Sequence, residues 1–159
     1  MKIYTATLML LIITLSCRTK QTCGGFLNPI HIKSTVTELK LTGIADTTIA
    51  YISGITSGKY KKRYKAEIMP SCIIKLVNKQ SQAIFSTIAG DGGIYKLALS
   101  AGTYDIEVSG MSCNDIVIRD VKIGTGYMMK LDVILGNAGE NEKTSIYQMK
   151  EDGSLIEIQ

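Results

Sequence analysis

The sequence predicts an all-β fold, a sandwich or a barrel, formed by one domain within 159 residues. Short runs alternate apolar and polar residues with the period of a half-buried strand. In 103–109, for example, Tyr104, Ile106 and Val108 fall on one face. Turn residues separate such runs at intervals of roughly 8 to 12 residues. No stretch keeps the 3.6-residue period over the length of a helix.

The alternating runs define the expected strands in chain order. Glycine lies in several of the turns between them, as at 90–93 and Gly102, because glycine adopts positive φ without steric cost. Residues 137–159 are expected to form a polar linker and a C-terminal hairpin with Asp152-Gly153 as its turn. The other expected strands are 36–44, 49–56, 71–78, 83–88, 94–99, 103–109, 115–123 and 128–135.

The N-terminal segment predicts an export signal rather than part of the fold. An apolar run over 6–15 is too short to cross a bilayer, since a membrane-spanning helix needs about 20 apolar residues. Cys17 directly follows the small residue Ser16, so 1–16 resembles a bacterial lipoprotein signal peptide. This resemblance implies that Cys17 is lipidated and becomes the first residue. The alternatives are a plain secretory signal and an uncleaved anchor.

Residues 17–35 are expected to form a tether that leads away from the membrane. Arg18 follows Cys17, whereas an aspartate there would retain a lipoprotein at the inner membrane. No acidic run in 18–22 resembles a surface-export signal. By resemblance to lipoprotein sorting in Gram-negative bacteria, this implies an outer-membrane protein that is anchored through the lipid on Cys17 and faces the periplasm.

Three cysteines remain once Cys17 is assigned to the lipid, an odd number for an exported protein. Cys72 begins an alternating run and is expected to face the core, and Cys113 lies beyond the strand at 103–109. The favoured interpretation is a Cys72–Cys113 disulfide, with Cys23 free. The alternative is three reduced thiols that act as small hydrophobic residues.

Residues 58–65, GKYKKRYK, place five basic residues around two tyrosines. Such a stretch could bind phosphate groups on lipid or nucleic acid, but the favoured interpretation is a solvated hairpin loop. The net charge of +4 is too small to predict nucleic acid as a partner. If the stretch is a contact loop, its residues are Lys59, Tyr60, Lys61, Lys62, Arg63 and Tyr64.

An ordered set of features over about 66–135 resembles the carboxypeptidase regulatory-like domain. The features are a strand at 72–77, Thr87, Tyr95 after a glycine turn, the turn Gly102-Thr103-Tyr104, and the run 131–135. The resemblance implies a single transthyretin-like antiparallel β-sandwich of about seven strands, placed within 36–136. Domains of this family serve folding or contact rather than catalysis. The chain departs from the family after Val108, where a Gly-aromatic pair is replaced by Gly110-Met111 or, in a shifted register, by Cys113.

No catalytic constellation, metal site or cofactor is expected. The one histidine, His31, lies in the tether, so Ser-His-Asp and Cys-His arrangements lack a base in the core. No cluster has metal-ligand spacing, and GDGG at 90–93 is too short for a phosphate loop. The hydrolytic branch of the transthyretin-like fold has several histidines and a C-terminal Tyr-Arg-Gly-Ser, and this chain has neither.

Two functions remain. The first is a non-catalytic, lipid-anchored envelope protein whose sandwich is a protein-interaction or structural module. The second is a glycan-binding module of the cell envelope. Glycan sites use exposed aromatic platforms, and without tryptophan only tyrosines such as Tyr51, Tyr60, Tyr64 and Tyr127 could serve. This scarcity favours the first function.

Overall fold

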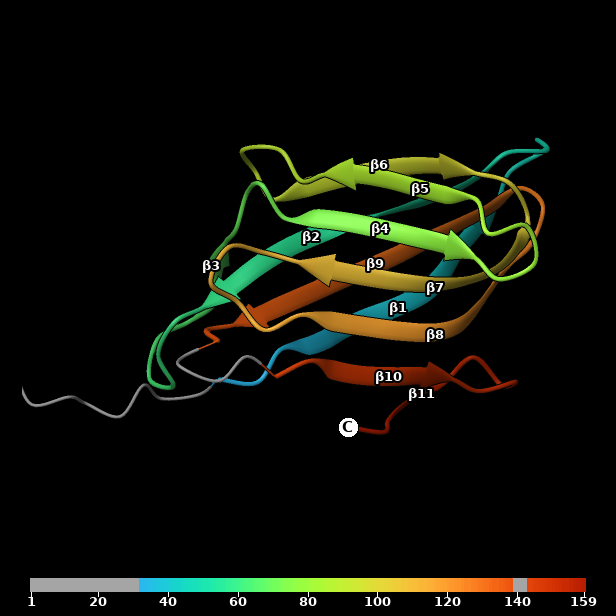
Figure 1. The fold of residues 1–159 in the computed structure, drawn as a ribbon. Helices are drawn as coiled ribbons and strands as arrows, with labels where there is room; N and C mark the ends of the chain where they lie inside the picture. The colour runs from blue at the N-terminus through green and yellow to red at the C-terminus, as the bar shows by residue number, and fades with distance from the viewer. Residues whose placement is uncertain (1–31, 139–142) are drawn as a thin grey trace, which may run out of the picture.

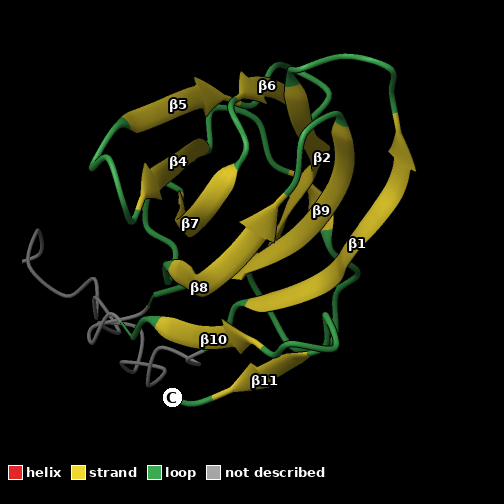
Figure 2. Cartoon of the chain, turned by 90° about the vertical axis from the view of Figure 1, so that its right-hand side faces the viewer, coloured by secondary structure: helices red, strands yellow, loops and turns green. Residues whose placement is uncertain are grey.

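The computed structural model describes residues 32–138 and 143–159, which form two β-sheets packed face to face (Figure 1; Figure 2). The strands are β1 (Thr35–Ile44), β2 (Ala50–Lys59), β3 (Glu67–Ile68), β4 (Ile73–Asn78), β5 (Ile84–Ile88), β6 (Ile94–Leu99), β7 (Gly102–Ser109), β8 (Ile116–Ile123), β9 (Tyr127–Gly136), β10 (Ser145–Met149) and β11 (Leu155–Glu157). One sheet has the order β1–β9–β2–β3, with β6 also pairing with β2, and the other has the order β11–β10–β8–β7–β4–β5. The all-β sandwich is confirmed.

Two details differ from the expected antiparallel sandwich of about seven strands. The described residues form eleven strands, because the short β3 and the C-terminal hairpin also join the sheets. Two pairs are parallel, β2 with β9 and β8 with β10. β9 lies between β1 and β2, which run in opposite directions, so it is antiparallel to β1 and parallel to β2. None of the described residues lies in a helix long and apolar enough to span a bilayer.

The core lies between the sheets and follows the predicted alternation. Tyr104 of β7 is fully buried, and its hydroxyl donates to the Ser100 carbonyl at 2.8 Å. Its ring meets the edge of Phe85 at 6.0 Å between centroids, a geometry that aromatic pairs favour. The other fully buried large side chains are Ile52, Ile74, Leu76, Ile106, Val108, Ile116, Ile118, Val121, Leu131, Val133 and Leu135.

The two sheet-forming strands β2 and β9 approach unusually closely at Gly54. A Cβ on Gly54 would lie 1.8 Å from the Leu131 carbonyl oxygen. That carbonyl instead accepts a hydrogen bond from the buried Tyr95 hydroxyl at 2.7 Å. The Ile55 amide donates to Asp132 Oδ1 at 2.9 Å. The side chains of Tyr95 and Asp132 therefore pair with backbone groups that would pair with each other in a regular ladder.

Gly54→Ala is expected to destabilise the fold by about 3 kcal/mol, because the added methyl group clashes with backbone that cannot move without separating β2 from β9. Gly90→Ala is the matched control, since its Cβ would meet only the Ile94 oxygen at 3.8 Å. Urea denaturation of both variants measures the difference. Equal midpoints for the two variants would show that the Gly54 contact does not constrain the sandwich.

Asn114 joins three segments of the chain at one end of the sandwich. Its side-chain amide donates to the carbonyls of Ile32, at 2.8 Å, and Asn137, at 3.1 Å. Its side-chain oxygen accepts from the Lys143 amide at 2.8 Å. The buried Ser34 hydroxyl donates to the Asn114 carbonyl at 2.6 Å. The ordered fold thus begins before residue 36, since Ile32 and Ser34 are both buried.

The predicted C-terminal hairpin is confirmed and belongs to the second sheet. β10 and β11 pair antiparallel around Gly153. Its φ of 82° favours glycine, because a Cβ atom would be strained in that conformation. Asp152 Oδ1 accepts from the Ser154 amide at 2.9 Å. β10 then adds to β8, with Ser145 opposite Ile116. The hairpin covers what would otherwise be the free edge of β8.

Asn114→Ala is expected to lower the free energy of unfolding by about 2 to 4 kcal/mol, because it removes the partners of two carbonyls and one amide. Hydrogen exchange in β10 should accelerate more than in β7, since Lys143 leads directly into the hairpin. Gln82→Ala, which removes one exposed hydrogen bond, is the control and should change stability by less than about 0.5 kcal/mol. Uniform acceleration of exchange in every strand would contradict a local role for Asn114.

Candidate functional site

The basic stretch is a hairpin loop, as the favoured interpretation predicted. β2 and β3 pair antiparallel, with Ser57 opposite Ile68 and Gly58 opposite Glu67, and residues 60–66 connect them. A backbone hydrogen bond of 3.1 Å from Tyr64 to the Lys61 carbonyl forms the turn. The cations therefore project from the end of a strand that is anchored in the first sheet. We call residues 59–65 the basic loop.

Two tyrosines give the basic loop an exposed aromatic surface. Tyr60 is 51% exposed and Tyr64 is 59% exposed. The Lys61 ammonium lies 5.4 Å from the Tyr64 ring centroid, within cation–π range. These side chains, with Lys65 and Glu67, line an open hollow of about 290 Å³. The pKa of the Tyr60 hydroxyl is raised, first by partial burial and then by the nearby thiols and Glu67.

The cations of the basic loop form no ion pair within the described residues (32–138 and 143–159). Several lysines elsewhere do form ion pairs: Lys75 meets Glu107 at 3.1 Å, and Lys130 meets Asp132 at 2.9 Å. The ion pairs involve Lys33, Lys40, Lys75, Lys79 and Lys130. The basic loop is thus a concentration of positive charge that the fold itself does not neutralise.

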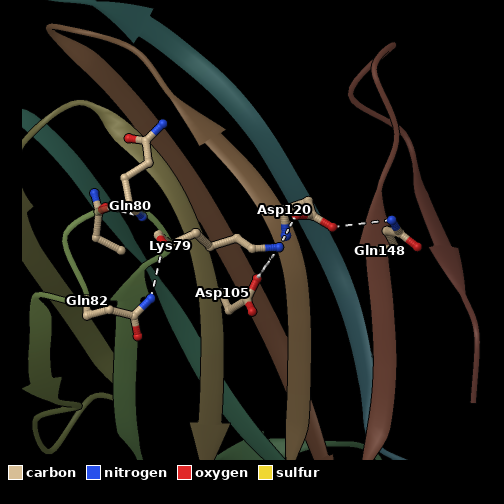
Figure 3. Close-up of polar contacts among 7 residues, drawn as sticks. Lys79, Gln80, Gln82, Asp105, Asp120 and Gln148 are labelled. Atoms are coloured by element: carbon tan, nitrogen blue, oxygen red, sulfur yellow. Dashed lines mark hydrogen bonds and ion pairs between the residues drawn. The ribbon is translucent and has the colours of Figure 1, made fainter.

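A polar cluster on the second sheet, at the end of the sandwich far from the basic loop, pairs its charges internally (Figure 1; Figure 3). Lys79 lies between Asp120, at 2.5 Å, and Asp105, at 4.0 Å. Asp120 also accepts from Gln148 of β10 at 3.3 Å. Asp120 has a φ of 61° at an irregularity in β8, and its amide donates to Asp105. This cluster ties β10 to the sheet and holds no unpaired charge for a ligand.

An apolar strip lies on the outer face of the second sheet. Ile73 and Ile88 are direct cross-strand neighbours on β4 and β5, and both point to solvent. Ile84 lies on the same face of β5 as Ile88 and is equally exposed, at 64%. Met111, in the loop after β7, lines an open hollow of about 350 Å³ together with Ile73. We call Ile73, Ile84, Ile88 and Met111 the apolar strip.

The expected Cys72–Cys113 disulfide is not formed. Both cysteines face the core, as predicted for Cys72, but both are free thiols. Both thiols contact Met69. The Cys113 sulfur lies 3.8 Å from Met69 Sδ, and the Cys72 sulfur lies 3.5 Å from the Met69 carbonyl oxygen. Burial raises the pKa of both thiols. Cys17 and Cys23 lie outside the described residues.

The tyrosines proposed for glycan contact do not form one surface. Tyr51 is half-buried, and the Lys96 ammonium covers its ring at 4.3 Å. Tyr127 is half-buried against the core. Only Tyr60 and Tyr64 remain as an exposed pair. Among the described residues, no group of three or more His, Cys, Asp or Glu side chains could hold a metal ion, and His31 lies outside them.

No protein-family model matches this chain, and no curated protein matches it closely enough to count as a relative. The fold therefore defines the chain as an all-β sandwich. Its candidate contact features are the basic loop at one end and the apolar strip on the second sheet.

Sequence reasoning identified the basic loop but missed the apolar strip. A signal for the strip was present in 83–88, where Ile84 and Ile88 lie on one face and Phe85 on the other, so that both faces of the strand carry large apolar side chains. Such a strand is typical of burial on two sides, and here one side is exposed.

Cys72 and Cys113 are expected to resist alkylation by iodoacetamide in the folded protein and to react fully in urea without reductant. Burial and the raised pKa deplete the reactive thiolate in the fold. Intact-mass spectrometry of a Cys17→Ser, Cys23→Ser variant purified from the periplasm counts the adducts. A protein that takes no adduct in urea until reductant is added would have formed the disulfide and would contradict the free thiols.

Proposed function

We propose that this chain is a non-catalytic, lipid-anchored protein of the outer membrane, whose β-sandwich acts as a protein-interaction or structural module facing the periplasm. The anchor rests on the signal-like segment 1–16 followed by Cys17. The similarity of 66–135 to the carboxypeptidase regulatory-like domain supports a contact role. The apolar strip is the observation that carries the proposal.

The apolar strip has the character of a protein contact surface. Cross-strand neighbours such as Ile73 and Ile88 have Cβ atoms about 5 Å apart, so their side chains form one continuous surface. Single exposed apolar residues are common, but contiguous ones mark contact sites. β5 is also the edge strand of its sheet, which leaves backbone groups available for a partner strand.

The interior supports a structural rather than a chemical role. Every buried side-chain nitrogen and oxygen in the described part of the chain has a hydrogen-bond partner. Buried groups such as Thr56 and Asn114 are engaged with backbone carbonyls that they hold in place. These polar groups specify the fold.

In living cells, chemical crosslinking followed by mass spectrometry is expected to capture a discrete envelope protein with the wild type and to lose it with Cys17→Ala. Ile88→Asp should also lose the captured protein while the melting curve stays unchanged, because the aspartate places a charge within the apolar strip. Ile44→Asp is the matched control, since Ile44 is 66% exposed on the other sheet.

Three outcomes would contradict the proposal. Equal capture by wild type and Cys17→Ala would exclude a role for the anchor. Equal capture by Ile88→Asp and Ile44→Asp would remove the apolar strip as the contact. Enrichment of saccharide or cell-wall fragments without any protein, lost in a Tyr60→Ala, Tyr64→Ala variant, would favour the glycan-binding alternative.

A further inference from the structure

The basic loop lies at the end of the sandwich where the chain enters from the tether. The Ile32 amide donates to the Asn137 carbonyl at 3.4 Å, and the Asn137 amide donates to the Lys59 carbonyl at 3.2 Å. One residue therefore connects the first described residue to the last residue of β2. Lys59 is also the first residue of the basic loop. Figure 1 shows the β2–β3 connection and the start of β1 at the same side of the molecule.

The length of the tether limits how far this end can lie from the lipid. Fourteen residues, 18–31, separate Cys17 from Ile32, and a fully extended chain of that length spans at most about 50 Å. The sequence of 18–31 includes Arg18 and Lys20 and no acidic residue. Two basic residues therefore lie just after Cys17, and the rest of 18–31 carries no Asp, Glu, Lys or Arg.

We propose that the basic loop binds the anionic surface of the membrane in which the protein is anchored, and so holds the sandwich with its tether end against the bilayer. This inference rests on the proposed lipid anchor. The observation that supports it is the position of the unpaired cations and exposed tyrosines of the basic loop, beside the first described residues of the chain.

The composition of the basic loop fits a lipid surface better than an acidic protein. Its cations form no ion pair within the described residues, and its hollow is open, so it offers no shaped site. A fluid array of phosphate headgroups needs no shape complementarity, and each Lys or Arg near it adds to binding. Tyrosine, with an apolar ring and a polar hydroxyl, is enriched at the interface between membrane and water.

The role that follows is orientation rather than anchoring. A lipidated cysteine with several acyl chains already holds the protein firmly, so a basic segment adds little to residence on the membrane. It does decide which end of the sandwich faces the lipid. With the tether end held down, the turn after β4, which carries Lys79, lies at the far end of the sandwich, away from the bilayer (Figure 1).

Vesicle flotation of the mature chain with Cys17→Ser, which carries no lipid, tests the contact directly. We expect the protein to float with vesicles that contain 30% phosphatidylglycerol in phosphatidylcholine, and not with phosphatidylcholine alone. Lys61→Gln, Lys62→Gln, Arg63→Gln should weaken the apparent affinity at least ~10-fold. The control, Lys122→Gln, Lys150→Gln, Arg119→Gln, makes the same change in net charge elsewhere on the surface and should stay within about twofold of the parent.

Hydrogen exchange on the lipidated wild type tests orientation. Amides of 60–66 should be protected on anionic vesicles relative to neutral ones, while those of 150–154 should not. Equal flotation of both triple variants, or no flotation on anionic vesicles in low salt, would overturn the inference. Absence of acyl chains on Cys17 in cells would overturn the anchored function itself, whereas loss of vesicle binding with Cys17 acylated would overturn only the loop contact.

Discussion

The insertion of β9 between β1 and β2 is the constraint on which the rest of the structure depends. It makes the β2–β9 pair parallel and brings β2 so close to Leu131 that only glycine fits at position 54. Tyr95, from β6 on the other side of β2, reaches across to the Leu131 carbonyl. Burial raises the pKa of Tyr95, which keeps its hydroxyl protonated as a donor. Three strands are thus held in register at one point.

The same insertion explains why the sequence predicted strands better than sheets. Period-two alternation depends on which face of a strand is buried, so β6 was located to the residue and β7 to within one residue. Alternation contains nothing about direction or neighbours, and so neither parallel pair was predicted. β3 is two residues long, too short for any period to be detected. The prediction of a Cys72–Cys113 disulfide was wrong for a related reason. That a cysteine side chain points into the core does not determine which residue lies next to its sulfur.

The candidate surfaces were predictable to different degrees. The basic loop is a local run of one charge and can be found in any sequence. The apolar strip arises only when β5 is known to be an edge strand whose outer face is uncovered. The role of Asn114 could not be predicted from the sequence. Its hydrogen-bond partners, Ile32, Asn137 and Lys143, lie about 80 and 20 to 30 residues away along the chain. Tertiary placement, rather than residue type, defines its role.

Asn114 connects these surfaces to one another. Because it holds Asn137 beside Ile32, it fixes the end of β2 and hence the basic loop next to the tether. β4 begins and β5 ends at the same end of the sandwich, so Ile73 and Ile88 lie toward it, on the outer face of the other sheet. If the basic loop meets the bilayer, a protein on the apolar strip lies beside the sandwich near the level of the lipid. The lower part of the apolar strip, Ile73 and Ile88, would then be within reach of a membrane-bound partner.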